Sequence, residues 1–92
     1  MALMLNGTLD YEERQLFVAE ARAEIESNNG VTLDCSEVGT IDDGTIGMMV
    51  TIARTAARRG GRVLLVKVPE GLAKQLDEAK VSDTFDWKPA RK

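Results

Sequence analysis

The sequence predicts an α/β domain in which a mainly parallel sheet of about four strands alternates with three main helices. Short apolar runs alternate along the chain with longer segments whose apolar residues recur at helical spacing. This pattern is typical of parallel strands joined by helical crossovers. A length of 92 residues suits one domain with one core. Because no linker, repeat or low-complexity segment divides the chain, we expect a single domain over residues 1–92.

The chain is expected to open with a short strand and a helix. Residues 2–5 form an apolar run suited to a strand, and the Asn-Gly pair that follows ends it. Asp10 and Glu13 have the spacing of a capping box, which predicts a helix start. An Asn-Asn-Gly sequence at residues 28–30 ends this helix. Its apolar stripe has a spacing of four residues and consists of Phe17, Ala21 and Ile25.

A second strand and a second helix follow. Residues 31–35 read as a strand, with Leu33 and Cys35 on one face. From residue 44 to residue 59 the pattern is helical, and the Gly-Gly pair at residues 60–61 favours a left-handed cap at its end. The apolar side of this helix consists of Met48, Met49, Ile52, Ala53 and Ala56.

The last part of the chain predicts a strand, a helix and a short final strand. The continuous apolar run at residues 63–66 is typical of a strand buried on both faces. Pro69 suits the first turn of the third helix. Residues 85–87 are the expected last strand, and residues 88–92 are expected to form a flexible tail. The inner face of the third helix consists of Leu72 and Leu76.

The composition is that of a soluble protein, with 43% hydrophobic and 29% charged residues. No apolar run approaches the ~18 residues of a membrane span, and residues 1–5 are too short for a signal peptide. We therefore expect a cytoplasmic protein without membrane insertion. The single cysteine, Cys35, is expected to be a small buried hydrophobic residue rather than a nucleophile.

Most catalytic templates are missing from the sequence. The chain has no histidine, which excludes Ser-His and Cys-His nucleophile pairs. One cysteine without histidine does not supply a zinc site. The Gly-Gly pair at residues 60–61 lacks the Lys-Ser/Thr pair of a phosphate-binding loop. We therefore expect a protein that is not an enzyme and that uses no cofactor and no metal.

Charge is distributed unevenly along the chain. Residues 1–50 hold ten acidic and two basic side chains, whereas residues 51–92 hold five acidic and ten basic ones. Arg54, Arg58 and Arg59 belong to the basic half, either as a solvated helix face or as a patch that steers an acidic partner. With one Trp, one Tyr, two Phe and no known DNA-binding motif, we expect no binding of nucleic acid.

Two adjacent carboxylates, Asp42 and Asp43, stand where the second helix is expected to begin. A helix N-terminus carries unpaired N–H groups and about half a positive charge, which favours acidic side chains there. An acid/base pair or a Mg²⁺ site is not expected, because adjacent residues at a helix start point in different directions. Two interpretations are left: an ordinary N-cap at Asp43, or a working site.

Several stretches of the chain resemble the motifs of a STAS domain, the fold of bacterial anti-sigma factor antagonists. Gly7-Thr-Leu-Asp10 resembles the Gly-Glu-Leu-Asp that opens the family's first helix. Leu33-Asp-Cys-Ser-Glu-Val38 is similar to Leu-Asp-Leu-Ser-Gly-Val, and Ile41-Asp-Asp-Gly-Thr-Ile-Gly47 to Ile-Asp-Ser-x-Gly-Leu-Gly. The Gly-Gly strand at residues 60–66 and the closing turn at residues 81–85 fit in the same order. The resemblance covers nearly the whole chain.

The resemblance implies a signalling protein that controls transcription by partner switching. In this family an anti-sigma factor, which is also a serine kinase of the GHKL type, binds the domain at the start of the second helix and phosphorylates a Ser there. Phosphorylation releases the partner. The partner implied here is such a kinase or another regulatory protein, and the chain itself is expected to be a monomer or a weak dimer. The implied partner-binding residues are Asp42, Asp43, Gly44 and Thr45.

The chain departs from the family pattern at the switch position. Asp42 matches the family's Asp, but Asp43 replaces the phosphoacceptor Ser, and Thr45 stands where the family has Gly. Three interpretations stay open: Asp43 is a fixed substitute for phosphoserine, Thr45 takes the phosphate instead, or the domain docks without any phosphorylation switch. An N-cap role for Asp43 is compatible with all three.

Short STAS proteins also serve as cytoplasmic subunits bound to the ATPase of ABC lipid transporters. Their motif is similar to Asp-Thr-Gly-Gly-Leu, with which residues 42–46 share Asp42 and Gly44. The resemblance therefore implies an ABC transporter ATPase as the alternative partner.

Overall fold

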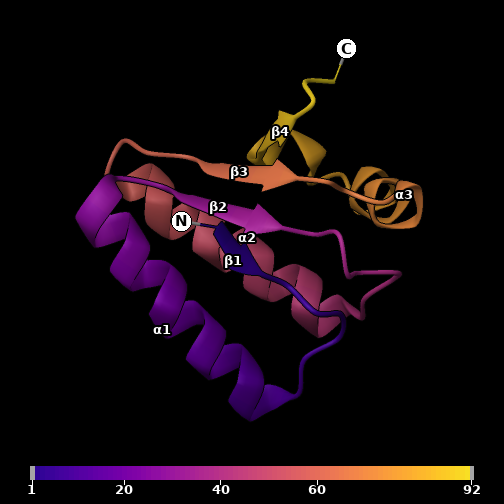
Figure 1. Ribbon diagram of the computed structural model, residues 1–92, viewed down its shortest axis with the longest axis horizontal. Helices are drawn as coiled ribbons and strands as arrows, with labels where there is room; N and C mark the ends of the chain where they lie inside the picture. Colours follow the sequence, from indigo (N-terminus) through magenta and orange to yellow (C-terminus); the bar gives the residue numbers. More distant parts are fainter. Residues whose placement is uncertain (1, 92) are drawn as a thin grey trace.

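The computed structural model describes residues 2–91, and its strands and helices follow the predicted alternation (Figure 1). A short 3-10 turn at Ser82–Thr84 precedes the last strand. The predicted α/β class is confirmed. The strands are β1 (Ala2–Met4), β2 (Val31–Asp34), β3 (Val63–Val66) and β4 (Asp86–Lys88), and the helices are α1 (Tyr11–Asn28), α2 (Asp43–Arg58) and α3 (Glu70–Glu78).

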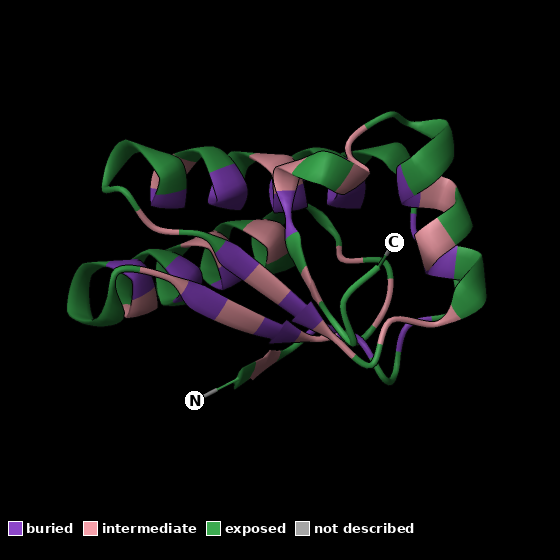
Figure 2. Ribbon diagram, turned by 90° about the horizontal axis from the view of Figure 1, so that it is seen from above, coloured by how far each residue is buried: buried purple, intermediate pink, exposed green. Residues whose placement is uncertain are grey.

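The sheet has the order β1-β2-β3-β4, and every pair of neighbouring strands is parallel. The register aligns Leu3, Leu33, Leu65 and Trp87 in one row across the four strands. All four side chains are buried in the core or pack against it. Figures 1 and 2 show α1 and α2 together on one side of the sheet, which is therefore the side of this row.

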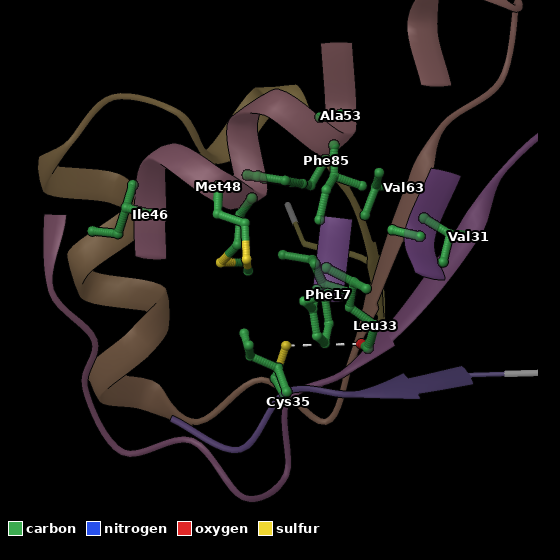
Figure 3. Close-up of a cluster of buried hydrophobic side chains, with 14 of the residues drawn as sticks. Phe17, Val31, Leu33, Cys35, Ile46, Met48, Ala53, Val63 and Phe85 are labelled. Atoms are coloured by element: carbon green, nitrogen blue, oxygen red, sulfur yellow. Dashed lines mark hydrogen bonds between the residues drawn. The ribbon is translucent and has the colours of Figure 1, made fainter. Parts of the chain in front are cut away.

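The predicted apolar faces of the helices form the core together with this row. Phe17, Ala21 and Ile25 of α1 are buried, and so are all five predicted residues of α2. Figure 3 shows Phe17 and Met48 near Leu33 and Cys35. Cys35 is fully buried, its Sγ donates to the Leu33 carbonyl, and burial raises the pKa of its thiol to about 12. A thiol with this pKa stays protonated and inert near neutral pH.

The expectation that β3 is buried on both faces is wrong. Val63 and Leu65 are fully buried, but Leu64 and Val66 are only half-buried. The physical reason is that α1 and α2 both pack on the same side of the sheet (Figure 2). A strand with a continuous apolar run is buried on both faces only where helices cover both sides of the sheet.

Two of the predicted helix ends are confirmed by their hydrogen bonds. At the start of α1, the Asp10 side chain accepts from the Glu13 N–H and the Glu13 side chain accepts from the Asp10 N–H, at 2.8 and 2.9 Å. At the end of α2, Gly60 has φ of 77° and donates to the Ala57 carbonyl, while Gly61 donates to the Ala56 carbonyl. This pair of bonds is the Schellman motif, which a left-handed glycine makes accessible.

The C-terminal residues contact the domain. Lys88 belongs to β4, and the Arg91 guanidinium bonds both oxygens of Asp77, at 2.8 and 2.9 Å. Arg91 also lies 4.2 Å from the centre of the Trp87 ring. Hydrogen bonds from Arg91 and Ser82 lower the pKa of Asp77 to about 2. The flexibility expected of residues 88–92 stays a prediction, and Lys92 lies outside the described residues.

Two glycines are expected to respond to alanine in opposite ways. A Cβ on Gly61 would lie 1.5 Å from the Asn29 carbonyl oxygen, whereas one on Gly47, inside α2, would meet nothing within 4 Å. Gly61→Ala should lower the free energy of unfolding by about 1–3 kcal/mol or prevent folding. Gly47→Ala should raise it by about 0.5–1 kcal/mol, because alanine restricts the unfolded chain more. Urea unfolding measures both, and changes of the same sign would contradict this packing.

Candidate functional site

The start of α2 is built around the Asp42 side chain. Asp42 has extended backbone angles, and its carboxylate accepts a hydrogen bond from the Thr45 N–H at 2.9 Å. Asp42 is therefore the N-cap, and Asp43 is the first residue of the helix. The expectation of an N-cap at Asp43 is wrong by one residue, because the cap is set by which carboxylate reaches the free N–H groups of the first turn.

Thr45 ties the start of α2 to the loop before α1. Its side chain is fully buried, and its Oγ1 accepts from the Leu9 N–H at 3.3 Å across 36 residues of sequence. The Thr45 side chain and backbone N–H both hydrogen-bond Asp42, and these bonds hold the pKa of Asp42 below its ordinary value. The hydroxyl thus links the cap residue of α2 to a distant loop.

The loop before α2 is held from the other side by α3. Gln75 Nε2 donates to the Ile41 carbonyl oxygen at 2.7 Å, and Gln75 Oε1 accepts from the Ile41 N–H at 2.9 Å. Ile41 itself is buried in the core. The first turn of α2 is therefore fixed both from the α1 side and from the α3 side, so that its exposed groups have a defined position.

Arg14 of α1 borders the site, and sequence reasoning missed it. Its guanidinium donates to the Leu9 carbonyl at 2.8 Å and lies so close to Gly44 that a Cβ there would be 2.9 Å from Nη1. Its charge also contributes, as a smaller cause, to the lowered pKa of Asp42. Nothing local in the sequence signals this contact, because it joins residues 30 positions apart. A hollow of 330 Å³ beside it is lined by residues of α1 and α2, among them Arg14, Gly44 and Met48.

The structure brings the four predicted residues together but does not expose all of them. Asp42, Asp43 and Gly44 are exposed, and Thr45 is buried. The basic side chains of Arg54, Arg58 and Arg59 are also exposed; the first two lie in the second half of α2, and Arg59 is its C-cap. The site therefore presents two carboxylates and a bare stretch of backbone, with Arg14 beside them.

Within residues 2–91 no group of three His, Cys, Asp or Glu side chains could hold a metal ion. Over the same residues, no helix is both long and apolar enough to cross a bilayer. A hollow of 690 Å³ lies elsewhere, around Asp77, Trp87 and Arg91, and contains none of the predicted residues. Within it, Asp77 pairs with Arg91, and Asp86 pairs with Arg62.

Comparison with known proteins places this chain among characterised folds. A family model described as "Mlab, STAS domain" matches residues 1–85. The chain is also similar to the crystal structure of a candidate anti-sigma factor antagonist from Thermotoga maritima, with a TM-score of 0.78 and 26% identity. That alignment covers 94% of this chain and 75% of the other. No curated protein matches significantly.

Thr45→Val should destabilise the start of α2. Valine keeps the shape of threonine but leaves the Leu9 N–H without its acceptor, which costs about 1–3 kcal/mol of unfolding free energy. The pKa of Asp42 should rise toward its ordinary value, since the bond from the Thr45 side chain is the largest cause of its lowering. Thr45→Ser is the control that keeps the hydroxyl. Carboxyl NMR titration should show the rise in the valine variant alone, and equal pKa values in both variants would refute this role.

Proposed function

Because this chain belongs to the STAS domain family, we propose that it is a regulatory module that binds a partner protein through the start of α2, in the manner of an anti-sigma factor antagonist. The family match covers residues 1–85. The similarity to a candidate antagonist of known structure supports the same class of function. The proposed partner is an anti-sigma factor with serine kinase activity of the GHKL type, or another regulatory protein, in the bacterial cytoplasm.

The exposed Asp43 carboxylate is the observation that carries this proposal. Asp43 is the first residue of α2, and the residues on either side of it are anchored by Thr45 and Gln75. In the resemblance to the family, this position carries the phosphoacceptor Ser. A fixed, exposed group at this point suits a partner whose binding depends on whether this position carries a hydroxyl or a negative charge.

The geometry favours docking without a phosphorylation switch. The Thr45 hydroxyl is buried and engaged by the Leu9 N–H, so a kinase would have to unfold the first turn of α2 to reach it. Asp43 carries one negative charge, whereas phosphoserine carries about −1.5 to −2. We therefore propose that Asp43 contacts the partner as a constant carboxylate and that Thr45 has a structural role.

A second candidate partner is the ATPase of an ABC lipid transporter. The specific observation in its favour is the family description, which names Mlab. Asp42 and Gly44, which match the motif of the transporter subunits, are both exposed at the same helix start. Either partner would therefore meet the same surface of this chain, and the identity of the captured protein separates the two candidates.

Partner capture with a charge-reversal variant tests the proposed surface. Tagged wild-type chain should recover a GHKL-type kinase from lysate of the native host, or an ABC ATPase for the second candidate. Asp43→Lys should lower recovery about tenfold or more. A partner surface that binds the Asp43 carboxylate is positively charged, and it would repel a lysine at this position. Glu26→Lys, another exposed acidic residue but near the far end of α1, is the matched control and should bind as wild type. Equal recovery by both variants, or recovery of nucleic acid alone, would contradict the proposal.

Asp43→Ser should restore a phosphoacceptor for a cognate kinase. Incubation with the captured kinase and ATP should add one phosphate to this variant, as read by intact mass, and none to wild type or to Asp43→Ala. The phosphate should map to residue 43. An unmodified serine variant would count against the alignment of Asp43 with the family's Ser. A stoichiometric Thr45 phosphopeptide from wild-type protein would overturn the structural role of Thr45.

A further inference from the structure

The sheet has an outer face that the helices leave open. The row of Leu3, Leu33, Leu65 and Trp87 packs toward α1 and α2, so the alternate residues of each strand point to the opposite side. Those alternate residues are exposed or half-buried in all four strands. Parallel sheets occur almost only with both faces covered. An open face on an all-parallel sheet therefore indicates that something else covers it.

The strand register arranges this outer face in two rows. Each row contains apolar side chains on β1 and β3. On β2 the first row has a hydroxyl and the second a carboxylate, and on β4 the first row has a carboxylate and the second an ammonium group. The first row is Ala2, Thr32, Leu64 and Asp86, and the second row is Met4, Asp34, Val66 and Lys88.

We propose that the outer face packs against the same face of a second copy of this chain, around a twofold axis that lies across the strands between the two rows. This axis brings each strand over its own counterpart and the first row over the second. Leu64 of one copy then meets Val66 of the other, and Ala2 meets Met4. Asp86 meets Lys88, and every one of these contacts occurs twice, as in any isologous interface.

The pattern of charges favours this axis over a twofold axis that runs along the strands. A twofold axis along the strands would place β1 over β4 and β2 over β3. Met4 would then face Lys88, and Val66 would face Asp34, so apolar groups would bury charges without partners. Of these two axes, only the one across the strands matches apolar with apolar side chains, Asp86 with Lys88, and Asp34 with the Thr32 hydroxyl. The face is therefore complementary to itself in one orientation.

The acidic groups of this face are already partly satisfied within each copy. Arg62 bonds Oδ1 of Asp86 at 3.1 Å, and the Asp34 carboxylate accepts from the Ser36 N–H at 2.9 Å. In the proposed dimer, the Thr32 hydroxyl of one copy donates to Asp34 of the other. Prior bonding lowers the cost of removing these carboxylates from water.

The size of the face sets the strength of the association. Eight side chains per copy fall short of the roughly 20–30 residues a side of a standard interface. The dimer is therefore weak and depends on concentration. α2 lies on the opposite side of the sheet (Figures 1 and 2), so Asp43 of each copy stays accessible to a partner. The inference goes beyond the proposed function and does not depend on it.

Sedimentation equilibrium of the full chain over a range of concentrations tests the dimer. Wild type should shift from monomer to dimer as its concentration rises. Val66→Asp should raise the dissociation constant about tenfold or more, because it buries two unpaired carboxylates. Leu16→Asp is the matched control: Leu16 is 67% exposed on α1, away from the outer face, and this variant should associate as wild type. Circular dichroism confirms that each variant is folded.

Two charge variants test the orientation. Lys88→Glu and Asp86→Lys should each weaken self-association, because each one sets like charges opposite one another. An equimolar mixture should associate again as a heterodimer, since both cross pairs are then of opposite sign. Wild type that stays monomeric at all concentrations, or Val66→Asp that associates as well as wild type, would overturn the proposal. A mixture that associates no better than the separate variants would overturn this twofold arrangement.

Discussion

The in-register alignment of four parallel strands is the constraint on which the rest of this structure depends. It sets Leu3, Leu33, Leu65 and Trp87 in one row, and that row is the platform for the apolar faces of α1 and α2. Parallel strands end at the same edge of the sheet. The segments that follow β2 and precede α2 therefore begin at this edge, where the N-terminal turn of α2 is presented.

Packing of both long helices on one side of the sheet divides the molecule into two surfaces with different properties. On the helical side, the start of α2 presents acidic groups that are positioned by partly buried hydrogen bonds. On the other side, the alternate residues of the strands form a regular pattern without a helix over it. Both surfaces follow from the same alignment of strands. The inner row supports the helices, and the alternate residues form the regular pattern of the other face.

The start of α2 owes its shape to bonds between segments that are distant in sequence. Thr45 meets Leu9, and Gln75 meets Ile41. These bonds place the exposed carboxylates of Asp42 and Asp43 on a frame with little freedom. For the proposed binding of a partner, such a preorganised frame is favourable, because little ordering of the chain is left to be done on binding.

Local patterns in the sequence determined the order of strands and helices, the capping box at Asp10, the Schellman end of α2 and the buried stripes of the helices, because each depends on residues a few positions apart. The sequence also placed the candidate site at residues 42–45. Only the tertiary structure decided that Asp42 rather than Asp43 is the cap, that Thr45 is buried while its neighbours are exposed, and that Arg14 lies over Gly44. The tertiary structure also decided that one face of β3 is open. The side of the sheet on which a helix packs depends on contacts between distant residues, and local spacing in the sequence does not encode it.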